Sequence, residues 1–314
     1  MTTSAMPLKL GLLGIGKIAR DQHIPALAAS PDFDLVACAS RNARVDGVAN
    51  FTDLETMLAE LPQLDCVSIC TPPQAHFAAA LTALRAGKHV MLEKPPTATT
   101  RQIMLLADAA RQHGRTLFQS WHSRFAAGVD DAREWLRTRA LTGGRIVWKE
   151  DVQRWHPGQQ WIWEAGGFGV FDPGINALSV LTEVLPDEVC VDAAVLAFPE
   201  NQQAPIAAGV RMRTEGGVTV DAEFDFRQKG EQSWDIELLT ATGRLKLSQG
   251  GATLAIDGEV VRTDPGLAGE YPRLYARFAS LCSAGRSEVD SRPFQLVADA
   301  FLVGERRIVA PHRV

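Results

Sequence analysis

Short apolar runs alternate with helical patterns over the first third of the chain. Helical spacing of apolar residues covers four stretches, and Gly87 and Gly114 stand where helix-terminating glycines belong. The predicted helices are 17–28, 54–60, 76–86 and 100–112. The apolar runs between them have the length of strands buried on both faces, at 9–13, 34–39, 65–70, 89–92 and 116–118. This alternation predicts a doubly wound parallel sheet with helices on both faces.

The pattern changes after about residue 122. Apolar and polar positions alternate strictly over 217–226, and 208–213 and 233–238 do much the same. Such alternation is typical of an antiparallel sheet with one buried and one wet face. Helical patterns at 172–185 and 271–283 can cover the buried face. We therefore expect an α/β domain over 1–121 and an α+β domain with a large, mostly antiparallel open sheet over 122–314.

A glycine fingerprint follows the first predicted strand. Gly14-Ile15-Gly16-Lys17-Ile18-Ala19 opens the first helix, where a Rossmann dinucleotide site requires such a motif. Gly14 permits the tight turn, Gly16 lets the backbone approach a pyrophosphate, and Lys17 and Ile18 open the helix beside it. The alternative is a plain strand–helix turn without a ligand.

The second strand ends without the acid that binds the ribose 2′-hydroxyl of NAD. Ser40 and Arg41 stand there, in the correct register after the fingerprint. A hydroxyl and a guanidinium suit a 2′-phosphate, so we expect NADP to be preferred and NAD still to be used. The alternative is an exposed turn arginine that binds nothing.

Two further motifs stand at the carboxyl ends of predicted parallel strands, where open α/β sheets bind their ligands. Thr71 and Pro72 follow one strand, Glu93 and Lys94 follow another, and His76 lies on the helix between them. We expect these five residues to line the cofactor site. Because two prolines follow Lys94, its backbone is restricted and its side chain can be aimed.

At these motifs the chain resembles the family of glucose-fructose oxidoreductase, inositol dehydrogenase and rhizopine catabolism proteins. The resemblance covers almost the whole chain and includes a later segment, 166–174. It implies a Rossmann domain followed by an open-sheet domain, with the Glu-Lys-Pro lysine, Lys94, as a catalytic residue. The segments 14–23, 121–124 and 148–179 are most similar to a bacterial subgroup that oxidises L-arabinose or D-galactose at the anomeric carbon.

The chain departs from the wider family in one helix of the second domain. Many members carry Asp and His four residues apart, whereas this chain has Asp172 and Asn176. That spacing puts both on one helix face. Since Asn does not titrate, Asp172 or Lys94 must handle the proton, and Asn176 can only orient a hydroxyl. The sugar dehydrogenases that the chain resembles carry the same Asp/Asn pair.

Six of the seven tryptophans fall between 121 and 163, among amides and ionisable groups. A sugar pocket needs flat apolar walls and a few fixed donors and acceptors. We expect substrate contacts from five residues: Glu150, His156, Trp155, Trp234 and His122. Each tryptophan could instead belong to the core, and His122 could be a satisfied histidine between the domains.

Together these features predict an NAD(P)-dependent aldose 1-dehydrogenase that oxidises an aldopyranose to the 1,5-lactone. One alternative is a non-catalytic dinucleotide-binding regulator of the same fold. Another keeps the enzyme and changes the substrate to an inositol or a dihydrodiol. The sequence does not rank arabinose against galactose, nor Lys94 against Asp172 as the base.

Composition limits the partners and the compartment. A net charge of -5 gives no field that would attract nucleic acid, and no apolar run is long enough for a membrane span. The five cysteines fit a reducing, cytoplasmic compartment, and the seven histidines show no zinc spacing, so we expect no metal. A charged outer sheet face favours a monomer or a weak homodimer; its residues are Arg211, Arg213, Asp221, Glu223, Asp225, Asp235 and Glu237.

Overall fold

The computed structural model describes residues 6–264 and 269–313. By its internal contacts the chain forms two units. One contains the described residues up to Trp121 together with Tyr271–Asp290; the other contains His122–Glu270 and the described residues from Ser291 onward. The expectation of two continuous domains, 1–121 and 122–314, is therefore wrong for one segment, because 271–290 belongs to the first unit.

The first unit is built on a parallel sheet of the Rossmann type. Its six strands are ordered β3-β2-β1-β4-β5-β6, and all five pairings are parallel. The strands are β1 Leu8–Leu13, β2 Phe33–Ala39, β3 Ala49–Phe51, β4 Cys66–Ile69, β5 His89–Leu92 and β6 Leu117–Gln119. The five predicted strands are confirmed. The edge strand β3 was missed, since its three residues, Ala-Asn-Phe, are partly exposed and form no apolar run.

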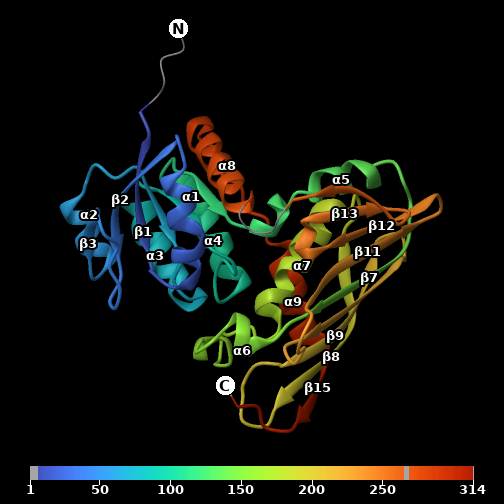
Figure 1. Cartoon of the computed structure of the whole chain (residues 1–314). Coiled ribbons are helices and arrows are strands. Elements are labelled where there is room, and N and C mark those ends of the chain that lie inside the picture. Colours follow the sequence, from blue (N-terminus) through green and yellow to red (C-terminus); the bar gives the residue numbers. More distant parts are fainter. Residues whose placement is uncertain (1–5, 265–268, 314) are drawn as a thin grey trace. The chain divides into compact units, whose positions relative to one another are not determined.

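Helices connect these strands as the sequence predicted. They are η1 Ala19–His23, α1 Ile24–Ala28, α2 Leu54–Glu60, α3 Pro73–Arg85 and α4 Thr100–Gln112. Gly87 and Gly114 follow α3 and α4 with positive φ values of 74° and 60°, as a helix-terminating glycine requires. The connections therefore bring the ends of β1, β2, β4 and β5 to one edge of the sheet (Figure 1).

The helix α8, Glu270–Ala284, was predicted to cover the second sheet and does not. From Tyr271 onward it belongs to the first unit, where it lies with the blue N-terminal elements in Figure 1. The Tyr275 ring packs 5.5 Å from that of Phe33, and Phe278 stacks between Phe33 and Phe118. Apolar periodicity shows that a helix has a buried face but not which sheet that face covers.

The second unit is a nine-stranded sheet covered on one face by helices. The strand order is β14-β13-β12-β11-β7-β10-β9-β8-β15, and only β7·β10 and β8·β15 pair in parallel. Its strands are β7 Leu141–Lys149, β8 Val189–Pro199, β9 Ala207–Thr214, β10 Thr219–Asp225, β11 Ser233–Thr240, β12 Gly243–Ser248, β13 Thr253–Ile256, β14 Glu259–Thr263 and β15 Gly304–Val309. This confirms the predicted fold class.

The helical segments of the second unit are η2 His122–Phe125, α5 Val129–Leu136, α6 Val152–Trp155, η3 Gln160–Ile162, α7 Phe171–Val184, η4 Gln249–Gly251 and α9 Arg292–Val303. Of these segments, α5, α7, α9 and η4 pack on one face of that sheet (Figure 1). α7 approaches β10 closely at Gly174, where a Cβ would lie 2.8 Å from the Phe224 ring. No helix of the described residues is long and apolar enough to cross a membrane.

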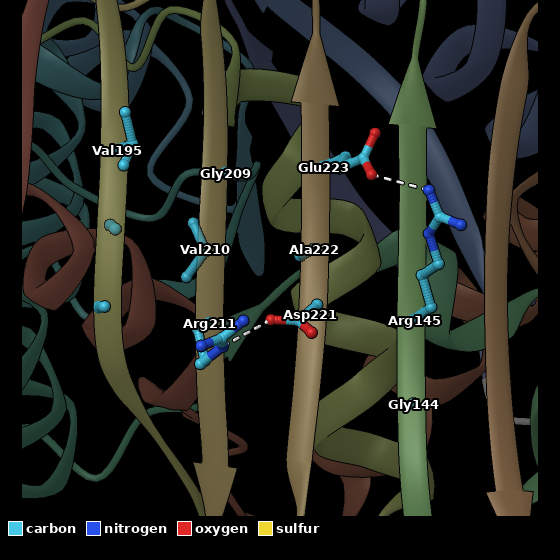
Figure 2. A pocket seen from close by; sticks show the side chains of 11 residues that line it. Gly144, Arg145, Val195, Gly209, Val210, Arg211, Asp221, Ala222 and Glu223 are labelled. Carbon is cyan, nitrogen blue, oxygen red and sulfur yellow. Dashed lines mark hydrogen bonds and ion pairs between the residues drawn. The ribbon is translucent and has the colours of Figure 1, made fainter.

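The outer face of the nine-stranded sheet is polar and shallowly hollowed. Figure 2 shows ion pairs across neighbouring strands, Arg211 to Asp221 at 2.9 Å and Arg145 to Glu223 at 2.7 Å. The hollow contains none of the predicted cofactor or substrate residues.

Candidate active site

The fingerprint turn has the geometry that a bound dinucleotide needs. Gly14 has a φ of 89°, and a Cβ there would lie 2.9 Å from the backbone of Cys70 and Thr71. A Cβ on Gly16 would meet no atom within 4 Å, so the backbone there faces open space. Lys17 is exposed and paired with Asp21. The turn is thus tightly built on its inner side and accessible on its outer side, which fits a pyrophosphate.

A pocket of about 520 Å³ lies beside the end of β2. Its nine described lining residues include Ser40, Arg41, Arg20 and Arg44, and none of the nine is acidic. Asn50 shapes the loop by exchanging hydrogen bonds with Val45 at 2.8 and 2.9 Å. The sequence identified two of these residues. Arg20 was missed, since no spacing rule links the first helix to this loop, and Arg44 was missed although it is only three residues after Arg41.

The turns after β4 and β5 are tied together by His76. This histidine has no exposed surface, and its ring nitrogens lie 2.5 Å from the Thr71 carbonyl and 3.1 Å from the Pro96 carbonyl. Burial lowers the pKa of His76 below its usual value, although both carbonyls oppose this. His76 therefore holds the two turns together from inside the protein, whereas Pro72 is exposed on the protein surface.

Three polar side chains at this edge of the sheet have no hydrogen-bond partner among the described residues. They are the Thr71 hydroxyl, the Gln119 amide and the Ser120 hydroxyl. Buried groups of this kind are destabilising unless something pairs with them, and a ligand with donors and acceptors would do so. Gln119 ends β6 and Ser120 follows it; both were missed, although the strand-end rule that found Thr71 applies to them too.

Glu93 and Lys94 differ in their surroundings. The Glu93 carboxylate is only 4% exposed, and its oxygens lie within 3.0 Å of the side chains of His23 and Tyr271 and of the Lys94 backbone N–H. Lys94 is half-buried. Glu93 was expected to bind the cofactor, but its carboxylate is engaged inside the protein.

The second unit contains a buried cluster of two carboxylates and a histidine. Glu150 follows β7, His156 follows α6, and Asp172 stands in the first turn of α7, where the helix dipole favours a negative charge. His156 Nε2 lies 2.9 Å from Glu150 Oε1, and Nδ1 lies 3.5 Å from Asp172 Oδ2. Three residues that the sequence singled out are therefore brought together.

Two tryptophans lie beside this cluster, and an amide follows Asp172 on the same helix. Trp234 donates from Nε1 to Glu150 Oε2 at 2.9 Å, and its ring meets the Trp155 ring edge-on at 5.2 Å. Asn176 is half-buried one helical turn after Asp172. The cluster combines flat apolar surface with fixed hydrogen-bonding groups, as a sugar pocket requires.

His122 has other partners. Its Nδ1 lies 2.6 Å from Glu270 Oε2, and both side chains are buried. This pairing corresponds to the alternative of a satisfied histidine. The pairing with Glu270 was missed because the two residues are 148 positions apart.

Taken together, a Rossmann unit with an open glycine turn and a second unit with a buried carboxylate–histidine cluster define a nicotinamide-dependent oxidoreductase. Residues 8–120 match the family described as "Oxidoreductase family, NAD-binding Rossmann fold". The chain belongs to this family, that of glucose-fructose oxidoreductase, inositol dehydrogenase and rhizopine catabolism proteins.

Relatives match along the full length of the chain. A Galactose 1-dehydrogenase from Pseudomonas fluorescens is 46% identical over 300 residues, 96% of this chain and 97% of the relative. The crystal structure of a D-galactose-1-dehydrogenase protein from Rhizobium etli is 50% identical, covers 100% of both chains and has a TM-score of 0.95.

A more distant structure shares the fold alone. It is a 3-ketoreductase from Actinomadura kijaniata in complex with NADP and TDP-benzene, 21% identical, covering 96% of this chain and 99% of its own, with a TM-score of 0.82. The fold is thus shared by a D-galactose-1-dehydrogenase protein and a 3-ketoreductase.

Proposed function

We propose that this chain is an aldose 1-dehydrogenase that oxidises D-galactose or L-arabinose, in the pyranose form, to the 1,5-lactone with NADP or NAD. The observation that carries the proposal is the buried Glu150–His156–Asp172 cluster beside Trp155 and Trp234. The full-length match to a Galactose 1-dehydrogenase supports the same substrate class.

The reaction removes a hydride from the anomeric carbon and a proton from its hydroxyl. The nicotinamide, when bound, accepts the hydride. The dinucleotide would be held by the fingerprint turn, by Thr71 and by the pocket beside the end of β2 that Arg41 lines, here called the Arg41 pocket. The proton has two candidate acceptors, Lys94 in the first unit and Asp172 in the second.

The remaining residues of the cluster would orient the sugar. Glu150 and Asn176 offer an acceptor and an amide for ring hydroxyls, and Trp155 or Trp234 offers a flat wall for C–H groups. His156 would hold Glu150 and Asp172 at a fixed separation, since its two ring nitrogens contact these two carboxylates. D-galactose and L-arabinose differ by one hydroxymethyl group, for which a pocket discriminates by about 1–3 kcal/mol. Both sugars are therefore proposed substrates.

The test measures cofactor reduction with a panel of D-galactose, L-arabinose, D-fucose, D-xylose, D-glucose and myo-inositol, and identifies the product by NMR. We expect turnover of the first three and a lactone product. A positioned base contributes about 10²–10⁴-fold, so Lys94→Ala or Asp172→Ala should lower kcat by that factor while dinucleotide binding persists. The control is Asp108→Ala, which removes an exposed aspartate paired with Arg111 on α4.

Each alternative has a distinct outcome. Dinucleotide binding without turnover of any sugar would favour a non-catalytic regulator. Turnover of myo-inositol, or of an added dihydrodiol, above the aldoses would favour the other substrate classes. Near-normal kcat in both variants would remove Lys94 and Asp172 from the mechanism.

A further inference from the structure

We propose that His23 and Tyr271 are positioning residues, which hold the Glu93 carboxylate so that it fixes the backbone of Lys94. This inference rests on the proposed function, because it gives Lys94 a role in turnover. Its observation is a separate one, a buried hydrogen-bond network inside the first unit.

The network joins three segments that are far apart in the sequence. The Tyr271 hydroxyl donates to Glu93 Oε1 at 2.7 Å, and His23 Nε2 lies 3.0 Å from the same oxygen. The other oxygen, Oε2, accepts the backbone N–H of Lys94 at 2.8 Å. His23 ends η1, directly after the fingerprint, whereas Tyr271 is 178 positions beyond Glu93 on α8. The network therefore links the fingerprint helix to the Glu-Lys-Pro turn.

The second tyrosine of the chain, Tyr275, contacts His23 but is outside the contacts that hold Glu93. Tyr275 lies one helical turn after Tyr271, and its hydroxyl is 2.8 Å from His23 Nδ1. The two rings pack edge-on against the His23 imidazole at 4.8 and 5.8 Å. His23, Tyr271 and Tyr275 have no exposed surface. Neither nitrogen of His23 is left to face a ligand, so the network acts within the protein.

Stability alone does not explain such a network. Replacing a buried ion pair by well-packed apolar residues is often neutral or stabilising, because desolvation of the charges is costly. A carboxylate that is hydrogen-bonded through both oxygens instead has a fixed position and orientation. Because one Glu93 oxygen is held by two side chains and the other by the Lys94 N–H, rotation of the carboxylate would displace the Lys94 backbone. A displacement of about 1 Å can lower a reaction rate about 10²-fold.

The charge on His23 suits this arrangement. Burial by itself disfavours the imidazolium, but the Cys70 thiol, the Tyr275 hydroxyl and the Glu93 carboxylate outweigh it and raise the pKa of His23 well above its usual value. Together with the Tyr271 hydroxyl, these are the titratable groups that face His23. Cys70 follows β4, Glu93 follows β5, and both tyrosines stand on α8. A protonated His23 donates from both nitrogens.

The test compares Tyr271→Phe with its matched control, Tyr275→Phe. Each change removes one buried hydroxyl from the same helix, but only Tyr271 touches Glu93. We expect Tyr271→Phe to lower kcat about 10- to 100-fold with an unchanged KM for the sugar. Tyr275→Phe should keep kcat within about threefold. Tyr275→Phe should lose at least as much thermal stability as Tyr271→Phe, since the Tyr275 hydroxyl contacts both His23 and Ser68.

A second measurement needs neither cofactor nor substrate. Amide exchange of Lys94, followed by NMR of ¹⁵N-lysine-labelled protein, reports the hydrogen bond to Glu93. It should accelerate about tenfold or more in Tyr271→Phe and stay unchanged in Tyr275→Phe.

The proposal is overturned if Tyr271→Phe keeps the wild-type kcat and Lys94 exchange, or if the two variants lose kcat equally. Lys94→Ala separates this outcome from failure of the proposed function. An inactive Lys94→Ala with a normal Tyr271→Phe refutes only the network. A fully active Lys94→Ala refutes the catalytic role of Lys94, whatever Tyr271→Phe does.

Discussion

Arg41 should determine the preference for NADP over NAD. Its pocket contains two further arginines, Arg20 and Arg44, and no acidic lining residue. A hydrogen bond to a charged group contributes about 1.5–3 kcal/mol, or about 10- to 150-fold in affinity. Arg41 is exposed, so solvent screening places its effect near the lower figure. We therefore expect Arg41→Ala to lower the NADP-to-NAD ratio of kcat/KM about tenfold.

The assay measures kcat/KM for both cofactors in the wild type and in Arg20→Ala, Arg41→Ala and Arg44→Ala. Effects of these variants should not simply multiply, because the three side chains would share one phosphate. The Debye length falls from about 10 Å at 0.1 M salt to about 3 Å at 1 M. The wild-type ratio should therefore fall with salt more steeply than the ratio of Arg41→Ala.

The matched control is Arg101→Ala, which removes an exposed arginine from α4 that lies outside the pocket. Its ratio should equal that of the wild type. If the ratio is unchanged in Arg41→Ala as well, Arg41 does not contact the 2′-phosphate. The alternative of an exposed turn arginine would then hold for the loop after β2.

Two other predictions concern stability and assembly. The pKa of His23 is raised in the folded protein. The unfolding free energy that protonated His23 contributes is therefore fully present below pH 6.5, the ordinary pKa of histidine, and is lost as the pH rises through the raised pKa of the folded protein. The difference in unfolding free energy between wild type and His23→Gln should therefore shrink in urea titrations from pH 6 to pH 9, and a constant difference would contradict this. The ion-paired outer sheet face of Figure 2 is a poor core for an obligate interface, so sedimentation should give a monomer; a dimer mass independent of concentration would refute it.

Local patterns were sufficient for most of the fold. Strands β1 and β5 and helices α2 and α4 lie within a residue of their predicted bounds, because buried parallel strands and amphipathic helices have clear periodicities. The glycine turn was also predictable, since a tight turn after β1 favours a glycine, and Gly14 has a φ of 89°. The predicted Glu150, His156 and Asp172 do lie together, although the sequence supplied only their residue types and the family resemblance.

The sequence by itself determined the fold class, the fingerprint turn and the Glu-Lys-Pro turn, because each depends on neighbouring residues. Only the tertiary structure decided that α8 joins the first unit and that its tyrosines reach His23 and Glu93. It alone added Arg20 and Arg44 to the Arg41 pocket and paired His122 with Glu270. These contacts join residues up to 252 positions apart. No local pattern encodes such contacts, since packing of the whole chain selects them from many helix faces of similar hydrophobicity.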